Sequence, residues 1–151
     1  MTKSNDSPST NDPYNLSRFV HAQEGDYEQA LSELRGGRKR SHWIWYIFPQ
    51  LAGLGHSHMS QVYGIRDRDE AVEYLEHPVL RPRLEAITSA AAEHVRRGVR
   101  LDRLMGSPID AQKLVASLTL FGSVARSLQA TPDADLRAFA AVTDEVLAGA
   151  E

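Results

Sequence analysis

The chain has 151 residues, of which 42% are hydrophobic and 25% are charged, and its formal net charge is −3. This length fits one domain with one hydrophobic core, and the composition excludes fibrous and disordered classes. The negative charge gives no overall field for binding nucleic acid, which we do not expect as a partner, and the absence of cysteine excludes disulfides and thiolate nucleophiles.

The first segment, residues 1–11, is polar and rich in Ser, Thr, Asn and Asp. We expect it to be a disordered tail, because it has few apolar side chains whose burial would offset the entropy of ordering it. It also lacks the apolar stretch of a secretion signal, and the longest apolar run, 43–48, is far shorter than the ~20 residues that cross a bilayer. We therefore expect a cytoplasmic protein without a membrane span, with a single helical domain over 12–151.

Two amphipathic stripes follow the tail. The Asp-Pro pair at 12–13 is typical of a helix start, and the stripe over 16–23 predicts a helix that ends near Gly25. The stripe over 27–34 predicts a second helix, which the glycine pair at 36–37 ends.

The next segment changes polarity abruptly. Three basic residues at 38–40 and His42 come directly before the densest aromatic stretch of the chain, 43–48. Propensity leaves this stretch open between a buried strand and a short helix, for which Ser41 could serve as the N-cap.

The rest of the chain consists of helical stripes separated by glycine and proline. Their spacing predicts one or two turns over 57–63, a helix capped by Asp67, a joint at 77–78, a helix up to Gly98, a turn over 101–105, a long helix after 107–108 and a last helix over 136–147. No alternating-strand segment or internal repeat accompanies them. The predicted fold class is all-α, a compact single-domain bundle of about six to eight helices.

The strongest candidate ligand site combines Arg38, Arg40, His42 and Trp43, since guanidinium donors beside an imidazole and an indole can hold a phosphate and a stacked base. Lys113 is a further candidate, because it shares one helix face with the small polar residue four positions later and could line a polar pocket. The alternative is that the basic residues form a solvated turn and the aromatic residues belong to the core.

His42 is the candidate catalytic residue, because an ordinary imidazole pKa of about 6.5 suits a general acid or base. No nucleophile stands beside it in the sequence. His56 and His58 are two residues apart, and this spacing points their side chains to different sides of a helix. They would chelate a metal ion poorly there, so we expect no metal site. The common motifs of nucleotide-binding proteins, serine hydrolases and zinc proteases are absent, and no cofactor is expected.

Several of these segments also occur in a known family. They are Asp-Pro-Tyr-Asn-Leu at 12–16, Arg-Ser-His-Trp-Ile-Trp-Tyr-Ile-Phe-Pro-Gln at 40–50, Gly-Leu-Gly at 53–55, Tyr-Gly-Ile at 63–65, His-Pro-Val-Leu at 77–80, and Lys113 with its neighbours. Through them the chain resembles the bacterial family catalogued as domain of unknown function 1810, over roughly Asp12 to Val124. After Val124 it departs from the aromatic and glycine-rich closing segment expected of the family.

The resemblance implies a compact all-helical fold and favours a helix over a strand for 43–48. It implies no established activity. Members are sometimes labelled calpastatin, but calpastatin inhibits its protease through disordered repeats, whereas this chain shows a single folded pattern.

Three functional hypotheses follow. The first is a module that binds a small anionic ligand, such as a nucleotide, at Arg38, Arg40, His42, Trp43 and Lys113. The second is an enzyme acting on a nucleotide-like or glycosidic substrate, with His42 as acid–base. The third is a protein-interaction scaffold that exposes the aromatic residues near Trp43.

Overall fold

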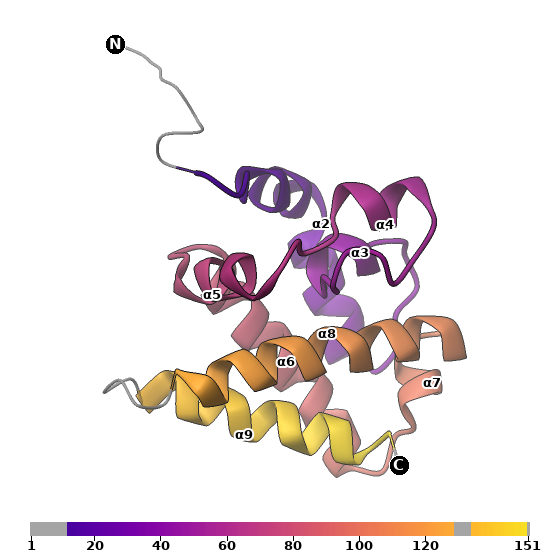
Figure 1. The fold of residues 1–151 in the computed structure, drawn as a ribbon. Helices are drawn as coiled ribbons and strands as arrows, with labels where there is room; N and C mark the ends of the chain where they lie inside the picture. Colours follow the sequence, from indigo (N-terminus) through magenta and orange to yellow (C-terminus); the bar gives the residue numbers. More distant parts are fainter. Residues whose placement is uncertain (1–11, 129–133, 151) are drawn as a thin grey trace.

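The fold consists of helices across the residues that the computed structural model describes, 12–128 and 134–150 (Figure 1). Within these ranges they are α2 Ser17–Arg35, α3 Ile44–Ile47, α4 His58–Val62, α5 Arg68–Glu76, α6 Leu80–Arg96, α7 Leu101–Leu104, α8 Pro108–Ser127 and α9 Ala134–Ala148. The prediction of an all-α fold with six to eight helices is confirmed, and the predicted tail over 1–11 lies outside the described residues.

The long helices share one hydrophobic core. Helices α8 and α9 run side by side, α9 also packs on α6, and α6 packs on α2 (Figure 1). Aromatic rings connect three of the helices, because the ring of Tyr74 on α5 lies 5.3 Å from that of Phe19 on α2 and 4.9 Å from that of Phe121 on α8. This frame holds the short helix α3, which packs on both α2 and α8.

Helix α2 runs without a break through Gly25, so the predicted end near that residue is wrong. Glycine in a helix interior costs only about 1 kcal/mol relative to alanine. The buried stripe continues across it from Phe19 and Gln23 to Tyr27 and Leu34. Burial of this long stripe outweighs the local preference of one glycine.

The predicted helix starts at Asp67 and Ser107 are confirmed. The side chain of Asp67 accepts a hydrogen bond from Glu70 N at 3.0 Å, and that of Ser107 accepts one from Asp110 N at 3.1 Å. At the predicted joint between α5 and α6, His77 Nδ1 accepts hydrogen bonds from the backbone N–H groups two and three residues later. These polar side chains therefore satisfy donors that a helix start leaves free.

The aromatic stretch over 43–48 forms the short helix α3, as the family resemblance favoured. Its N-cap position is Trp43, which makes no side-chain cap, and the hydroxyl of Ser41 instead donates to Glu33 on α2. No helix in the described ranges is both long and apolar enough to cross a bilayer.

Candidate functional site

The five predicted ligand-binding residues lie in different surroundings. Arg38, Arg40 and His42 lie exposed on the turn after α2, and their side chains make no hydrogen bond or ion pair with other described residues. Trp43 is buried, with 1% of its surface exposed. Of the five predicted ligand-binding residues, Lys113 is the one that lines the pocket described below.

Glu33 on α2 shapes this turn. Its Oε1 accepts hydrogen bonds from the backbone N–H groups of Arg40 and Ser41 at 2.8 and 3.0 Å and from Trp43 Nε1 at 2.9 Å, and its Oε2 accepts one from the Ser41 hydroxyl at 2.6 Å. Partial burial disfavours the Glu33 carboxylate, but the four hydrogen bonds outweigh it and lower its pKa from 4.5 to about 2. The Trp43 indole is thereby fixed inward with its N–H satisfied.

Lys39, between the two exposed arginines, points into the protein. Its side chain is 5% exposed, and its Nζ lies 2.8 Å from Asp110 Oδ2 and 4.9 Å from the Trp43 ring centroid. It also donates to the backbone carbonyl of Ser41. The basic triplet is thus divided between the core and the solvent.

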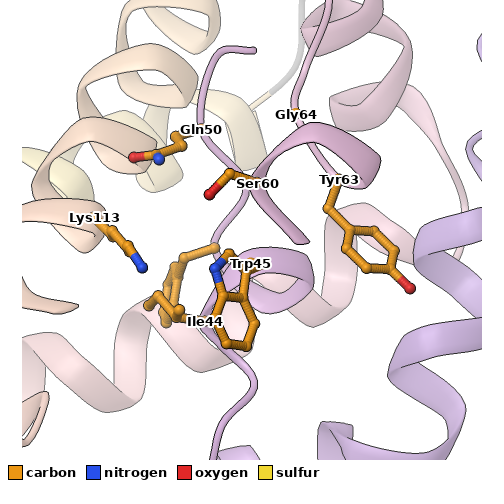
Figure 2. A pocket seen from close by; sticks show the side chains of 8 residues that line it. Ile44, Trp45, Gln50, Ser60, Tyr63, Gly64 and Lys113 are labelled. Atoms are coloured by element: carbon orange, nitrogen blue, oxygen red, sulfur yellow. The ribbon is translucent and has the colours of Figure 1, made fainter. Parts of the chain in front are cut away.

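A second lysine and a second tryptophan repeat this arrangement nearby. Lys113 Nζ lies 5.2 Å from the ring centroid of Trp45 and 3.9 Å from Asp110 Oδ1. Around them is a small hollow, which we name the Trp45–Lys113 pocket and whose lining residues are Ile44, Trp45, Phe48, Gln50, Ser60, Tyr63, Gly64 and Lys113 (Figure 2). Helices α3, α4 and α8 therefore each contribute to one site.

Polar groups in this pocket face the same space. Figure 2 shows the indole nitrogen of Trp45 and the ammonium of Lys113 pointing toward the space between them, with Ser60 and Gln50 above this space. Trp45 Nε1 is buried and has no hydrogen-bond partner among the described residues. A buried donor without a partner costs about 1–3 kcal/mol.

The enclosed space of the pocket is small. Its interior space is about 10 Å³, close to what one water molecule needs, within a hollow of about 230 Å³ counted out to open solvent. The enclosed space therefore has room for about one water molecule.

One wall belongs to the loop over 51–63, which contains α4. This helix buries none of its residues, and the loop is closed at its base by a bridge in which Ala52 N donates to Ile65 O at 2.8 Å and Ile65 N donates to Gln50 O at 2.9 Å. Few buried contacts hold the loop itself, so its ends fix its position.

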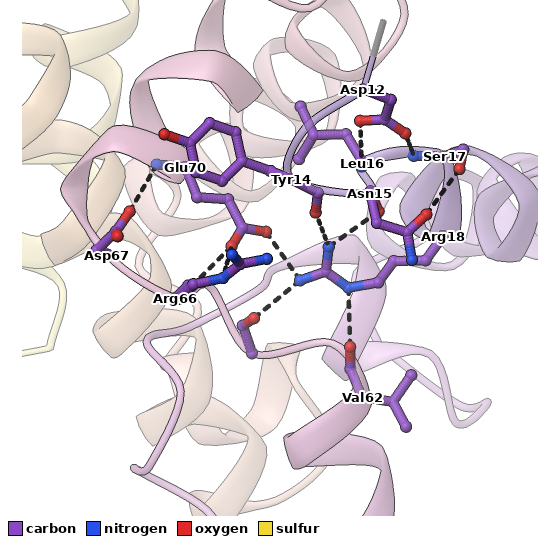
Figure 3. A network of polar contacts seen from close by, with 11 residues as sticks. Asp12, Tyr14, Asn15, Leu16, Ser17, Arg18, Val62, Arg66, Asp67 and Glu70 are labelled. Carbon is purple, nitrogen blue, oxygen red and sulfur yellow. Dashed lines mark hydrogen bonds and ion pairs between the residues drawn. The ribbon is translucent and has the colours of Figure 1, made fainter. Parts of the chain in front are cut away.

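Arg18 on α2 holds the far end of this loop (Figure 3). Its guanidinium donates to the carbonyls of Val62 and Gly64 at 2.8 and 2.9 Å and to the fully buried carboxylate of Glu70 at 2.8 Å. The second Glu70 oxygen accepts from Arg66 N at 2.9 Å. This ion pair joins α2 and α5 to the wall of the pocket.

Other features predicted from the sequence lie elsewhere. His56 and His58 are exposed, and within the described ranges no group of three acidic or histidine side chains could hold a metal ion. The exposed aromatic patch of the scaffold hypothesis is not present at Trp43, which is buried. Large exposed apolar side chains occur instead at Leu51, Leu54, Val62 and Ile109.

The predicted site residues did not include four that line the pocket, Trp45, Gln50, Ser60 and Tyr63. Trp45 looked like a core aromatic, and the others stand in a loop whose return toward α3 no local pattern encodes. Trp45, Gln50 and Tyr63 could have been found from the sequence, because they lie in the segments 40–50 and 63–65 through which the chain resembles its family, whereas Ser60 lies between these segments.

Comparison with known proteins extends the resemblance along the chain. The family described as "Protein of unknown function (DUF1810)" matches residues 13–150, so the match continues beyond Val124, where sequence analysis placed its end. The crystal structure of the conserved hypothetical protein Rv1873 from Mycobacterium tuberculosis, at 1.38 Å, is 38% identical. The match covers 93% of this chain and 92% of that one, with a TM-score of 0.77. No curated protein matches the chain.

Proposed function

The chain belongs to the DUF1810 family of proteins of unknown function, and we propose that it binds a small anionic ligand in the Trp45–Lys113 pocket. The observation that carries this proposal is the buried, unpartnered Nε1 of Trp45 beside the ammonium of Lys113. An indole N–H and an ammonium can only donate hydrogen bonds, so a ligand that satisfies both must present acceptors. Because one of the donors is charged, an anion gains more than a neutral acceptor.

The pocket supports binding better than the exposed turn does. Arg38, Arg40 and His42 are solvated, and solvated cations contribute little to holding a small anion because water competes for it. Lys113 is partly shielded, with 24% of its side chain exposed. Its attraction for an anion is therefore less screened.

We propose binding in preference to catalysis because His42, the acid–base of the enzyme hypothesis, is not among the residues that line the pocket. The lining residues supply donors, a cation and apolar walls. In the described contacts the Ser60 hydroxyl is paired with Ser57 and the Lys113 ammonium with Asp110, so these two residues do not form a nucleophile–base pair.

Ligand binding is tested by thermal shift and calorimetry with a panel of acetate, benzoate, phosphate, AMP and ADP-ribose. A ligand that binds only the folded protein adds about 2.7 kcal/mol of stability at 100 times its dissociation constant. We expect at least one compound to stabilise the protein. If no compound binds at about 1 mM, the Trp45 N–H donates its hydrogen bond to a water molecule instead of a ligand, and the proposal is contradicted.

Matched variants locate the site. Lys113→Gln and Arg40→Gln each remove one positive charge, the first in the pocket and the second on the turn. We expect Lys113→Gln, and also Trp45→Phe, to weaken binding about tenfold or more, since each removes a hydrogen bond worth about 1.5–3 kcal/mol to a charged group. Arg40→Gln should bind normally. The opposite result, with loss in Arg40→Gln alone, would place the ligand on the turn.

A further inference from the structure

The charge balance at the pocket restricts which anions it can take. Lys39 and Lys113 approach the two oxygens of a single carboxylate, that of Asp110, at 2.8 and 3.9 Å. Two cations thus share one anion, which leaves one net positive charge. Lys113 is the only charged residue among those that line the pocket in the described part of the chain.

One positive charge matches a monoanion. A carboxylate carries one negative charge at neutral pH, whereas a phosphate monoester carries about 1.5 to 2. A surplus charge that is moved out of water without a partner is costly. Phosphate is also commonly held by the planar guanidinium of arginine, which forms two parallel hydrogen bonds, and no arginine is among the described residues that line this pocket.

The shape of the pocket also favours a carboxylate over a phosphate. The inner space of about 10 Å³ is the size of one water molecule, which one carboxylate oxygen can replace, whereas a phosphoryl group brings three oxygens. The walls around it are the side chains of Ile44, Trp45, Phe48 and Tyr63, which are largely apolar and mostly flat. Such walls suit an aromatic or other flat apolar body.

We infer that the Trp45–Lys113 pocket selects the carboxylate of a small, flat, apolar acid over phosphate esters. This inference rests on the proposed function. One carboxylate oxygen accepts from Trp45 Nε1, the other faces Lys113 Nζ, and the apolar body lies at the mouth of the hollow.

Three ligands with the same ring test this selection by calorimetry: benzoate, benzamide and phenyl phosphate. Benzamide has nearly the shape of benzoate without its charge, and phenyl phosphate adds charge and volume. We expect benzoate to bind at least tenfold more tightly than either. In Lys113→Gln the advantage of benzoate over benzamide should disappear, because the charge that distinguishes them has lost its partner.

The other outcomes distinguish a failure of the carboxylate inference from a failure of the proposed function. Tightest binding by phenyl phosphate, lost in Lys113→Gln, would overturn the carboxylate inference and keep the proposed function. The same holds if AMP or ADP-ribose binds through Lys113 while none of the three ring compounds does. Equal binding of benzamide and benzoate would show that charge plays no part and would overturn the inference.

A charge change behind the pocket tests the mechanism of selection. Asp110→Asn adds one net positive charge without altering a lining residue. We expect the preference for benzoate over phenyl phosphate to fall roughly tenfold, because a charge within several ångströms in a partly shielded site interacts strongly with a dianion. In Lys39→Met/Asp110→Asn, which removes the shielded pair together, one positive charge remains and the preference for benzoate should return. If the Asp110→Asn variant folds and its ratio of affinities for benzoate and phenyl phosphate equals that of the wild type, the inference is overturned.

Discussion

The ammonium of Lys39 and the carboxylate of Asp110 lie 2.8 Å apart, with 5% and 19% of their side chains exposed. This ion pair fastens the turn after α2 to the first turn of α8. Lys113 stands one helical turn further along α8 and faces the other oxygen of the same carboxylate. The pair that stabilises the turn therefore also sets the charge seen by the pocket.

Replacing Lys39 with methionine should destabilise the protein by about 2 kcal/mol. The variant loses the ion pair, the hydrogen bond to the Ser41 carbonyl and the contact with the Trp43 ring, while the partial exposure of Asp110 limits the cost. Urea unfolding followed by circular dichroism measures the change. Arg38→Met, which removes an exposed cation from the same turn, should lie within about 0.5 kcal/mol of the wild type. Equal effects of the two variants would contradict a special role of Lys39.

Glu33 should make stability depend on pH in the acid range. Its pKa is about 2 in the folded protein and 4.5 without the surrounding contacts, so the unfolded chain binds the proton more readily between these values. The stabilisation is fully present above pH 4.5 and is lost as the pH falls toward 2. Glu33→Gln should be less stable than the wild type at pH 7 by about 1–3 kcal/mol, with a smaller difference near pH 2.

The control for this experiment is Glu28→Gln, an exposed carboxylate on the same helix. Urea unfolding at a series of pH values should give parallel curves for Glu28→Gln and the wild type. A constant difference between Glu33→Gln and the wild type from pH 7 to pH 2 would disprove the linkage.

The Arg18–Glu70 pair should be important for stability. Glu70→Gln leaves the guanidinium of Arg18 without its fully buried carboxylate partner, and breaking such a pair costs about 3–5 kcal/mol, toward the lower value here because 16% of Arg18 is exposed. Arg66→Gln is the control, because the Arg66 side chain is 62% exposed and 3.9 Å from Glu70, and it should cost less than about 1 kcal/mol. Thermal unfolding of both variants measures the two losses of stability. A larger loss in Arg66→Gln than in Glu70→Gln would refute the prediction.

Gly64→Ala should disturb the wall of the pocket. A Cβ at this position would lie 2.7 Å from Ala52 Cα and 3.0 Å from the Ser60 carbonyl, so the backbone of the loop must shift. We expect a loss of about 1–3 kcal/mol in stability and weaker ligand binding. Gly25→Ala is the matched substitution in open space within α2, and it should stabilise the protein by about 0.5–1 kcal/mol. Equal unfolding temperatures for the two variants would argue against the predicted clash.

Local features of the fold were predictable from the sequence. The caps at Asp67 and Ser107 and the joint at His77 were predicted correctly, because each depends on side chains and backbone groups within a few residues. The all-α class followed from helical stripes for the same reason. The continuity of α2 through Gly25 was not predictable locally, because it depends on the core that the helix covers.

The sequence by itself determined the all-α class, the caps at Asp67 and Ser107, and the presence of basic and aromatic residues beside one another. Only the tertiary structure decided that Lys39 is buried while Arg38 and Arg40 are solvated, because the partner that holds Lys39 lies on α8. It likewise decided that Lys113 faces Trp45 and that Trp43 is internal. Residues of the same charge or ring type are equivalent in a sequence, and they become different only when packing gives each one its own partners and its own share of solvent.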